Sequence, residues 1–263
     1  MLNNLEIPNE ALTETVKSTD KHLGETYDNV VNLPTKAIGY GLSSIINLVF
    51  SPFKYLNDKS SLSFQHKLRI YEKELEEKEK SIPEDKKVEP DFHSVSLALD
   101  NSKFCITNDV LRMMFVNLIG NSMHSDKKDM AHPAFAEIIK QMCTLDAMIL
   151  TTFKNDAVQP IINIMKSNSD KSTTMLYRDL FFAFIENIPY SYELFSMSIS
   201  NLNHLGLVKI DYTVSLHHKK LYDELKAISS EIISYSMDEI KFTEGIVTLT
   251  PLGNKFVSVC LSD

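Results

Sequence analysis

The stretch from Ile106 to Phe153 constrains the fold most, because its apolar residues recur at a spacing of three to four in three successive segments. Thr107 is a suitable N-cap for a first helix, Pro133 suits the first position of a second, and Thr144 can cap a third. The inward positions are Val110, Leu111, Met114, Phe115, Leu118, Ile119, Phe135, Ile138, Ile139, Met142, Leu145, Ile149, Leu150 and Phe153. We therefore expect a helical core at the centre of the chain.

The size of the chain predicts more than one module. At 263 residues it exceeds the commonest domain size of about 100 to 150 residues. Its 43% hydrophobic and 24% charged residues are ordinary for a globular protein, so a sizeable core can form. We expect a mobile arm over 1–25, helices and a linker over 26–90, a central helical domain over 91–155 and a further domain over 156–263.

The cysteines give no sign of a metal site or of a redox pair. Cys105, Cys143 and Cys260 are each isolated, without the CxxC spacing that such sites use. We expect three reduced, buried thiols. The N-terminus lacks both the basic start and the apolar run of a signal peptide, so the cytoplasm is the expected location.

Residues 37–53 contain no charged side chain and form an apolar stripe at helical spacing. The stripe consists of Ile38, Leu42, Ile45, Ile46, Val49 and Phe50. The run is too short and too polar to span a bilayer, which needs about 20 apolar residues. Two alternatives remain: packing on the body of the protein, which we favour, or peripheral contact with the inner face of the membrane. The cations Lys36 and Lys54 only flank the run, whereas interfacial helices carry them along the polar face.

A long charged helix should follow over 57–82, with a narrow apolar seam. The seam residues are Phe64, Leu68, Tyr71 and Leu75. The composition of 83–90 predicts a linker, and 91–100 can form a short helix with Phe92, Val95 and Leu99 inward.

The C-terminal part predicts a mixture of helices and strands. Segments 159–166 and 175–185 can form strands, although a helix stays open for the second. A helix over 192–205 should end at Gly206, followed by a strand over 207–212.

An inserted helix should then pack through Leu216, Leu221, Leu225, Ile228 and Ile232. Glu244 and Gly245 are expected to form a turn before a strand over 246–249, and Thr250 and Pro251 should start a closing helix. This order predicts a mainly α protein with a small β component, ending in a winged-helix-like domain with an extra helix between the wing strands.

One loop gathers residues that could hold a metal. His124, Asp126, Asp129 and His132 could ligate zinc or manganese, but Lys127 and Lys128 lie among them and would oppose a cation. A solvated loop is therefore the favoured interpretation, and we predict no metal and no cofactor. Ser122 lacks the surroundings of a nucleophile elbow, and no phosphate-binding loop is present. These observations do not indicate a catalytic site or a small-molecule ligand.

Charge argues against DNA binding by the predicted winged helix. Duplex binding relies on Lys and Arg contacts to phosphate, and residues 186–206 contain neither, while the whole chain carries a net charge of -8. Protein interaction is the favoured role for this module. Tyr190, Tyr192 and Met197 could form the contact surface, since aromatic residues and Met are enriched at interfaces. The alternative is that they complete the core.

Two segments together resemble the abortive infection alpha family. They are IGNSMHSDKKDMAHPAFAEIIKQMCTLDAMIL and the ending ISNLNHLGLVKIDY with GIVTLTPLGNKFVSVC, and the likeness extends over roughly residues 25 to 262. The resemblance implies a link to bacterial antiphage defence, in which an infected cell stops growing. It implies no catalytic residue.

From these observations we expect a non-enzymatic defence component that acts through a protein partner or through self-association. A membrane-acting effector using the helix over 37–53 and a winged-helix regulator binding DNA are the alternatives.

Overall fold

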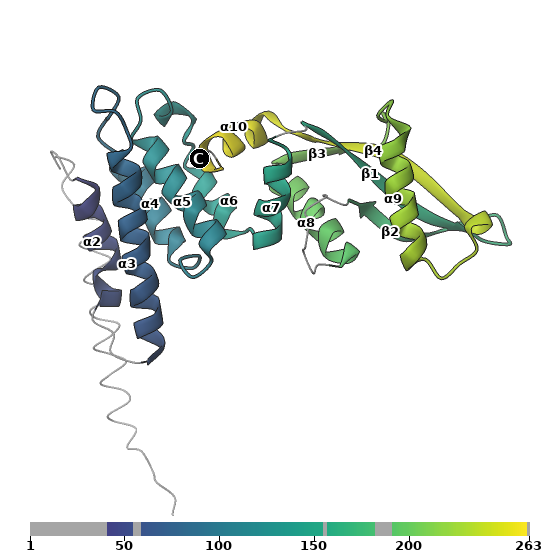
Figure 1. Cartoon of the computed structure of the whole chain (residues 1–263), viewed down its shortest axis with the longest axis horizontal. Coiled ribbons are helices and arrows are strands. Elements are labelled where there is room, and N and C mark those ends of the chain that lie inside the picture. The colour runs from purple at the N-terminus through teal and green to yellow at the C-terminus, as the bar shows by residue number, and fades with distance from the viewer. Residues whose placement is uncertain (1–40, 55–58, 155–156, 182–190, 262–263) are drawn as a thin grey trace, which may run out of the picture.

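The structure, a computed structural model, shows an elongated molecule with a helical body at one end and a β-sheet lobe at the other (Figure 1). It describes residues 41–54, 59–154, 157–181 and 191–261. The predicted arm over 1–25, together with Ile38 and Tyr190, lies outside these residues.

The helical body contains the first helices of the described chain. They are α2 (Leu42–Lys54), α3 (Lys59–Lys80), α4 (Phe92–Ser102), α5 (Asp109–Ser122), the short 3-10 helix η1 (Lys128–Met130), α6 (Ala134–Lys140) and α7 (Thr144–Thr152). Helix α5 lies at the centre, in contact with α3, α4, α6 and α7. Its predicted apolar positions Leu111, Met114 and Phe115 are buried, whereas Val110 remains 36% exposed.

A buried ion pair joins α5 to α3. The guanidinium of Arg112, which is only 5% exposed, donates from Nε and Nη2 to the two carboxylate oxygens of Glu74 at 2.8 and 2.9 Å. It also donates to the carbonyl of Ile106 at 3.1 Å. Because both oxygens of Glu74 accept from one planar group, the pair fixes the register of the two helices. The seam residues Leu68, Tyr71 and Leu75 of α3 are buried beside it, as predicted.

The stripe of α2 faces the interior. Leu42, Ile45, Ile46, Val49 and Phe50 are all buried, with exposed fractions between 0 and 9%. The ring of Phe50 meets that of Tyr71 edge to face at a centroid distance of 6.1 Å. In this arrangement the described part of the stripe packs on α3 and α4, the packing alternative favoured from the sequence.

The sheet lobe is built on four antiparallel strands in the order β2, β1, β4, β3. Its elements are β1 (Val158–Ser167), β2 (Thr173–Leu180), α8 (Tyr192–His204), β3 (Val208–Asp211), α9 (Lys219–Ile232), the 3-10 helix η2 (Met237–Glu239), β4 (Ile240–Leu249) and α10 (Pro251–Cys260). The strand predicted over 159–166 is confirmed, and the 175–185 segment is a strand up to Leu180 rather than a helix.

The two faces of the sheet belong to different cores. Ile162 and Ile164 of β1 pack with Tyr222 and Leu225 of α9 in a small separate cluster. Their neighbour Ile161 points the other way and joins the main core. The chain then returns to the helical body through α10, whose last carbonyls, at Val259 and Cys260, accept hydrogen bonds from the Asn121 and Asn117 side chains of α5.

The turn predicted at Glu244 and Gly245 is wrong, because β4 runs straight through both residues. Gly245 lies opposite Ile161 in the register, and a Cβ on it would lie 2.5 Å from the ring of Tyr212. The glycine therefore provides room for a tyrosine ring packed on the sheet, not a turn.

The C-terminal part agrees with the predicted winged helix in the order of its elements but not in the arrangement of its strands. A helix, two strands and a closing helix do follow one another, with α9 inserted, and Gly206 ends α8 with φ +74° as predicted. The strands, however, form half of a four-stranded sheet instead of a separate two-stranded wing.

Two local predictions in the central helices also need correction. The N-cap of α5 is Asn108 rather than Thr107, and its side chain accepts from the backbone N of Val110 and Leu111. Helix α7 begins at Thr144, the residue expected to cap it, so that Cys143 occupies the cap position. Cys143 is exposed, not buried as predicted.

Candidate interaction surface

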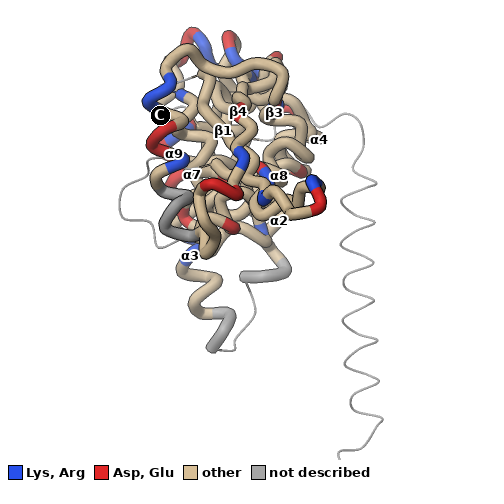
Figure 2. The backbone as a smooth tube through the Cα atoms, turned by 90° about the vertical axis from the view of Figure 1, so that its right-hand side faces the viewer, with Lys and Arg blue, Asp and Glu red and all other residues tan. Residues whose placement is uncertain are grey.

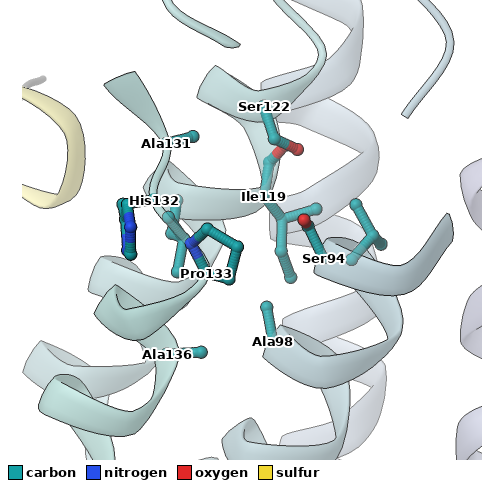
Figure 3. Close-up of a pocket in the computed structure, with 10 residues that line it drawn as sticks. Ser94, Ala98, Ile119, Ser122, Ala131, His132, Pro133 and Ala136 are labelled. Carbon is teal, nitrogen blue, oxygen red and sulfur yellow. The ribbon is translucent and has the colours of Figure 1, made fainter. Parts of the chain in front are cut away.

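The cavity drawn in Figure 3 is too small for a substrate. It lies between α4, α5 and the start of α6 and encloses about 10 Å³, roughly the space of one water molecule. Ser94, Ser122 and His132 line it with polar atoms, but the His132 ring points away from the two hydroxyls (Figure 3). Ser122 Oγ donates to the carbonyl of Ile119 at 2.6 Å, and His132 Nδ1 accepts from the backbone N of Ala134 at 3.1 Å. Both side chains therefore complete helix ends.

A wider groove of about 580 Å³ runs between α3, α5, α7 and α10. Its lining includes Met113, Glu77, Lys154 and Cys260. Burial raises the pKa of the Cys260 thiol well above its usual value, so the sulfur stays protonated and is a poor nucleophile. The groove thus offers an apolar floor with mixed charges on its rim and no activated thiol.

The loop considered for a metal has other partners. Asp126 accepts from Lys86 Nζ at 2.5 Å, and this hydrogen bond lowers the pKa of its carboxyl. His124 Nδ1 accepts from the backbone N of Asp126 at 3.2 Å. Asp129 belongs to η1, and His132 lies at the start of α6. Among the residues that the structure describes, no three His, Cys, Asp or Glu side chains are grouped as a metal would require.

The charges of the sheet lobe are interspersed. Figure 2 views the molecule from this end and shows Lys and Arg positions interspersed with Asp and Glu positions along the backbone. Several of them are paired: Glu244 accepts from Lys219 Nζ at 2.6 Å and from Lys226 Nζ at 2.7 Å. A surface with both signs interleaved lacks the single-sign field that attracts nucleic acid.

Helix α8 is held firmly against the rest of the protein. Its inner positions Phe195, Ile199 and Leu202 are almost completely buried. At its C-terminal half, the Asn201 side chain donates to the buried carboxylate of Asp146 at 2.9 Å. The same carboxylate accepts from the backbone N of Cys143 at 2.8 Å, so the start of α7 and the side of α8 share one acceptor. The outer face of α8 is therefore presented by a rigid element.

That outer face carries large apolar side chains in solvent. Met197 is 57% exposed and Leu194 is 37% exposed. Tyr192, which the sequence suggested for the same surface, is half buried and packs against the α9 side of the sheet. Of the three suggested residues, Met197 alone lies on the open face among those described.

Four exposed residues of α8 follow a line along the helix. Glu193, Met197, Ser200 and His204 are all exposed and are separated by four, three and four positions, which places them on one side of a helix. We call these four residues the α8 stripe. A hydrogen bond from the Ser191 side chain lowers the pKa of Glu193, so its carboxylate is ionised at neutral pH. The helix has no Lys or Arg, and its one imidazole, His204, lies at the opposite end.

Other apolar side chains are exposed in the described chain, at Phe104 in the α4–α5 connection and at Tyr235 and Met237 near the tip of the sheet. Phe104 and Tyr235 each lie under a lysine ammonium, that of Lys140 at 5.2 Å and that of Lys166 at 4.1 Å. These contacts occupy one face of each ring. The α8 stripe combines exposure with a rigid, regular element, and it is the strongest candidate contact surface.

Comparison with known families decides where the chain belongs. The family model described as abortive infection alpha matches residues 63–260, which is most of the chain. The chain belongs to the abortive infection alpha family. The match includes α8 and the whole sheet, whereas α2 and its apolar stripe lie outside it. It is also shorter than the likeness over residues 25 to 262 expected from the sequence.

Two further comparisons add nothing to this assignment, since no curated protein and no solved structure matched the abortive infection alpha chain. None of its described helices has both the length and the hydropathy needed to cross a bilayer.

Proposed function

We propose that the chain is a non-enzymatic component of bacterial antiphage defence that acts through protein contacts made by the outer face of α8. Family membership supports the abortive infection context. The observation that carries the mode of action is the exposure of Met197 and Leu194 on a helix that is anchored on its other side and has no Lys or Arg.

Met is enriched at protein interfaces, and a flexible thioether adapts to the shape of a partner. The depletion of charge at the centre of the α8 stripe matches the core of an interface, while Glu193 and His204 lie at its ends as rim residues would. A winged-helix origin of the module stays an interpretation that rests on the order of α8, β3, β4 and α10.

The defence role is tested by expressing the chain in a bacterial host and challenging it with a broad panel of phages. We expect fewer plaques and a lower phage yield than in cells with an empty vector, together with loss of growth of the infected cells. Unchanged plaque formation and host survival for every phage in the panel would contradict the proposal.

A further inference from the structure

The α8 stripe has a symmetry that points to one kind of partner. Its positions, 193, 197, 200 and 204, are distributed evenly about a point midway between residues 198 and 199. If a second α8 lies against it in the opposite direction, about a two-fold axis through that point, each stripe residue meets another stripe residue. Glu193 then faces His204 of the other copy, and Met197 faces Ser200.

Both pairings are favourable. An ionised carboxylate at one end of the helix meets an imidazole at the other, whose ring N–H can donate a hydrogen bond to it. The long Met197 side chain meets the small Ser200, so a protruding group faces a position with little bulk. Antiparallel helices also place opposite ends of their dipoles side by side.

We propose that the α8 stripe binds a second copy of this chain in antiparallel orientation, and this inference rests on the proposed function because it names the partner of that surface. The spacing of four, three and four is that of the contact seam in packed helix pairs. A basic partner could pair only with Glu193, and the phosphates of a nucleic acid would be repelled by the same carboxylate, whereas a second copy uses both polar ends. Figure 1 shows α8 at the lower edge of the molecule in that view, between α7 and β2.

The contact is short, with one helix of 13 residues from each copy, so we expect a reversible dimer. Sedimentation of the full chain over a range of concentrations should show a monomer–dimer equilibrium with a dissociation constant on the order of micromolar. Met197→Glu brings two carboxylates close to the two-fold axis and should leave only monomer.

A charge exchange tests the orientation. Glu193→Lys alone and His204→Glu alone should each raise the dissociation constant about tenfold, since each change acts twice in a symmetric dimer. The double variant Glu193→Lys/His204→Glu should return it close to the wild-type value. Val214→Lys, an exposed change in the β3–α9 connection outside α8, should have no effect. Circular dichroism and melting of each variant confirm that α8 remains folded.

Wild-type chain that stays monomeric at hundreds of micromolar would overturn the inference, and so would a double variant that is weaker than both single variants. Protection against phage by a strictly monomeric chain would leave the proposed function standing and remove only the second copy as partner. If the double variant restores dimerisation but the wild-type chain gives no protection against phage, the antiparallel dimer stands and the proposed function is contradicted.

Discussion

At the scale of single residues, a cluster of three side chains fixes the end of the edge strand β2. Tyr212 donates its phenol to Asp179 at 2.8 Å and lies 3.0 Å from the amide oxygen of Asn163. The backbone N of Asp179 donates to the same amide oxygen at 2.8 Å. Asp179 has φ +54°, a left-handed conformation that is strained for residues with a side chain, so these bonds hold the strand in a shape it would not adopt alone.

Tyr212→Phe should therefore destabilise the fold. The change removes the donor from a half-buried carboxylate, which leaves the oxygen without its partner and costs about 1 to 3 kcal/mol of unfolding free energy. Urea unfolding measures the loss. Tyr235→Phe is the matched control, because the Tyr235 ring is 47% exposed and its loss of a hydroxyl should cost under about 0.5 kcal/mol. Equal, small effects at both positions would contradict the role given to the cluster.

Glu244 predicts how the stability of the sheet lobe depends on pH. Hydrogen bonds from Lys219 and then Lys226 lower the pKa of its carboxyl below the usual value. In the acid range the folded chain therefore binds fewer protons than the unfolded chain. The stabilisation of the fold by the Glu244 ion pairs is present at neutral pH and is lost as the pH falls through the pKa of the folded state.

Glu244→Gln should lower the free energy of unfolding by about 1 kcal/mol at pH 7, a modest figure because Lys219 is largely in solvent. The difference between variant and wild type should shrink below about pH 4. Denaturant unfolding at a series of pH values measures it. Glu224→Gln, whose pairing with Lys220 is exposed and 3.9 Å long, should show almost no difference. If the free energy of unfolding of the wild type exceeded that of Glu244→Gln by a larger amount at lower pH, the role given to Glu244 would be contradicted.

At the scale of elements, α2 is packed on the helical body, and detaching it would lower the stability of the fold. Ile45 is 1% exposed, so Ile45→Asp buries an unpaired charge and should destabilise the chain by more than about 3 kcal/mol. Ser43→Asp on the outer face of the same helix should be nearly neutral, because an acid near a helix start is tolerated.

Variants of α2 can also distinguish packing on the protein body from contact with a membrane. Because the stripe is occupied by α3 and α4, we predict that folded wild-type chain does not co-sediment with anionic liposomes. Co-sedimentation that Ser43→Asp preserves and Ile45→Asp abolishes, with the fold intact, would instead favour a membrane-acting helix.

Helix periodicity made most elements predictable from the sequence, as the buried seam of α3 and the inner face of α8 show. The prediction at Gly245 failed for a non-local reason: the ring that needs the missing side chain belongs to Tyr212, which is distant in sequence. Local signals also placed the caps of α5 and α7 one residue away from their true positions, since neighbouring polar residues can both serve as caps.

The candidate site was partly predictable as well. Met197 was identified from its residue type and the lack of cations around it, and the structure places it on the open face. The full α8 stripe was missed, although its signal was present: once Phe195, Ile199 and Leu202 define the inner face, helical spacing assigns Glu193, Met197, Ser200 and His204 to the outer one. The proposed pairing of Glu193 with His204 required knowledge of where the helix begins and ends.

At the scale of the whole molecule, the sheet lobe and the helical body are joined by shared packing. Side chains from α2 to α10 contribute to one main core, and α10 ties the last strand back to α5. A second, small cluster joins α9 to the far face of the sheet. This construction anchors α8 to the rest of the protein through its buried residues Phe195, Ile199 and Leu202.

Phage protection by surface variants tests the account most directly. Cells expressing wild type, Met197→Glu or Val214→Glu at equal soluble levels are challenged with a phage that the wild type restricts. Val214 is 48% exposed in the β3–α9 connection, outside α8, and serves as the matched control. We predict that Met197→Glu loses protection while Val214→Glu keeps it. Full protection by a folded Met197→Glu chain would contradict a function exercised through α8.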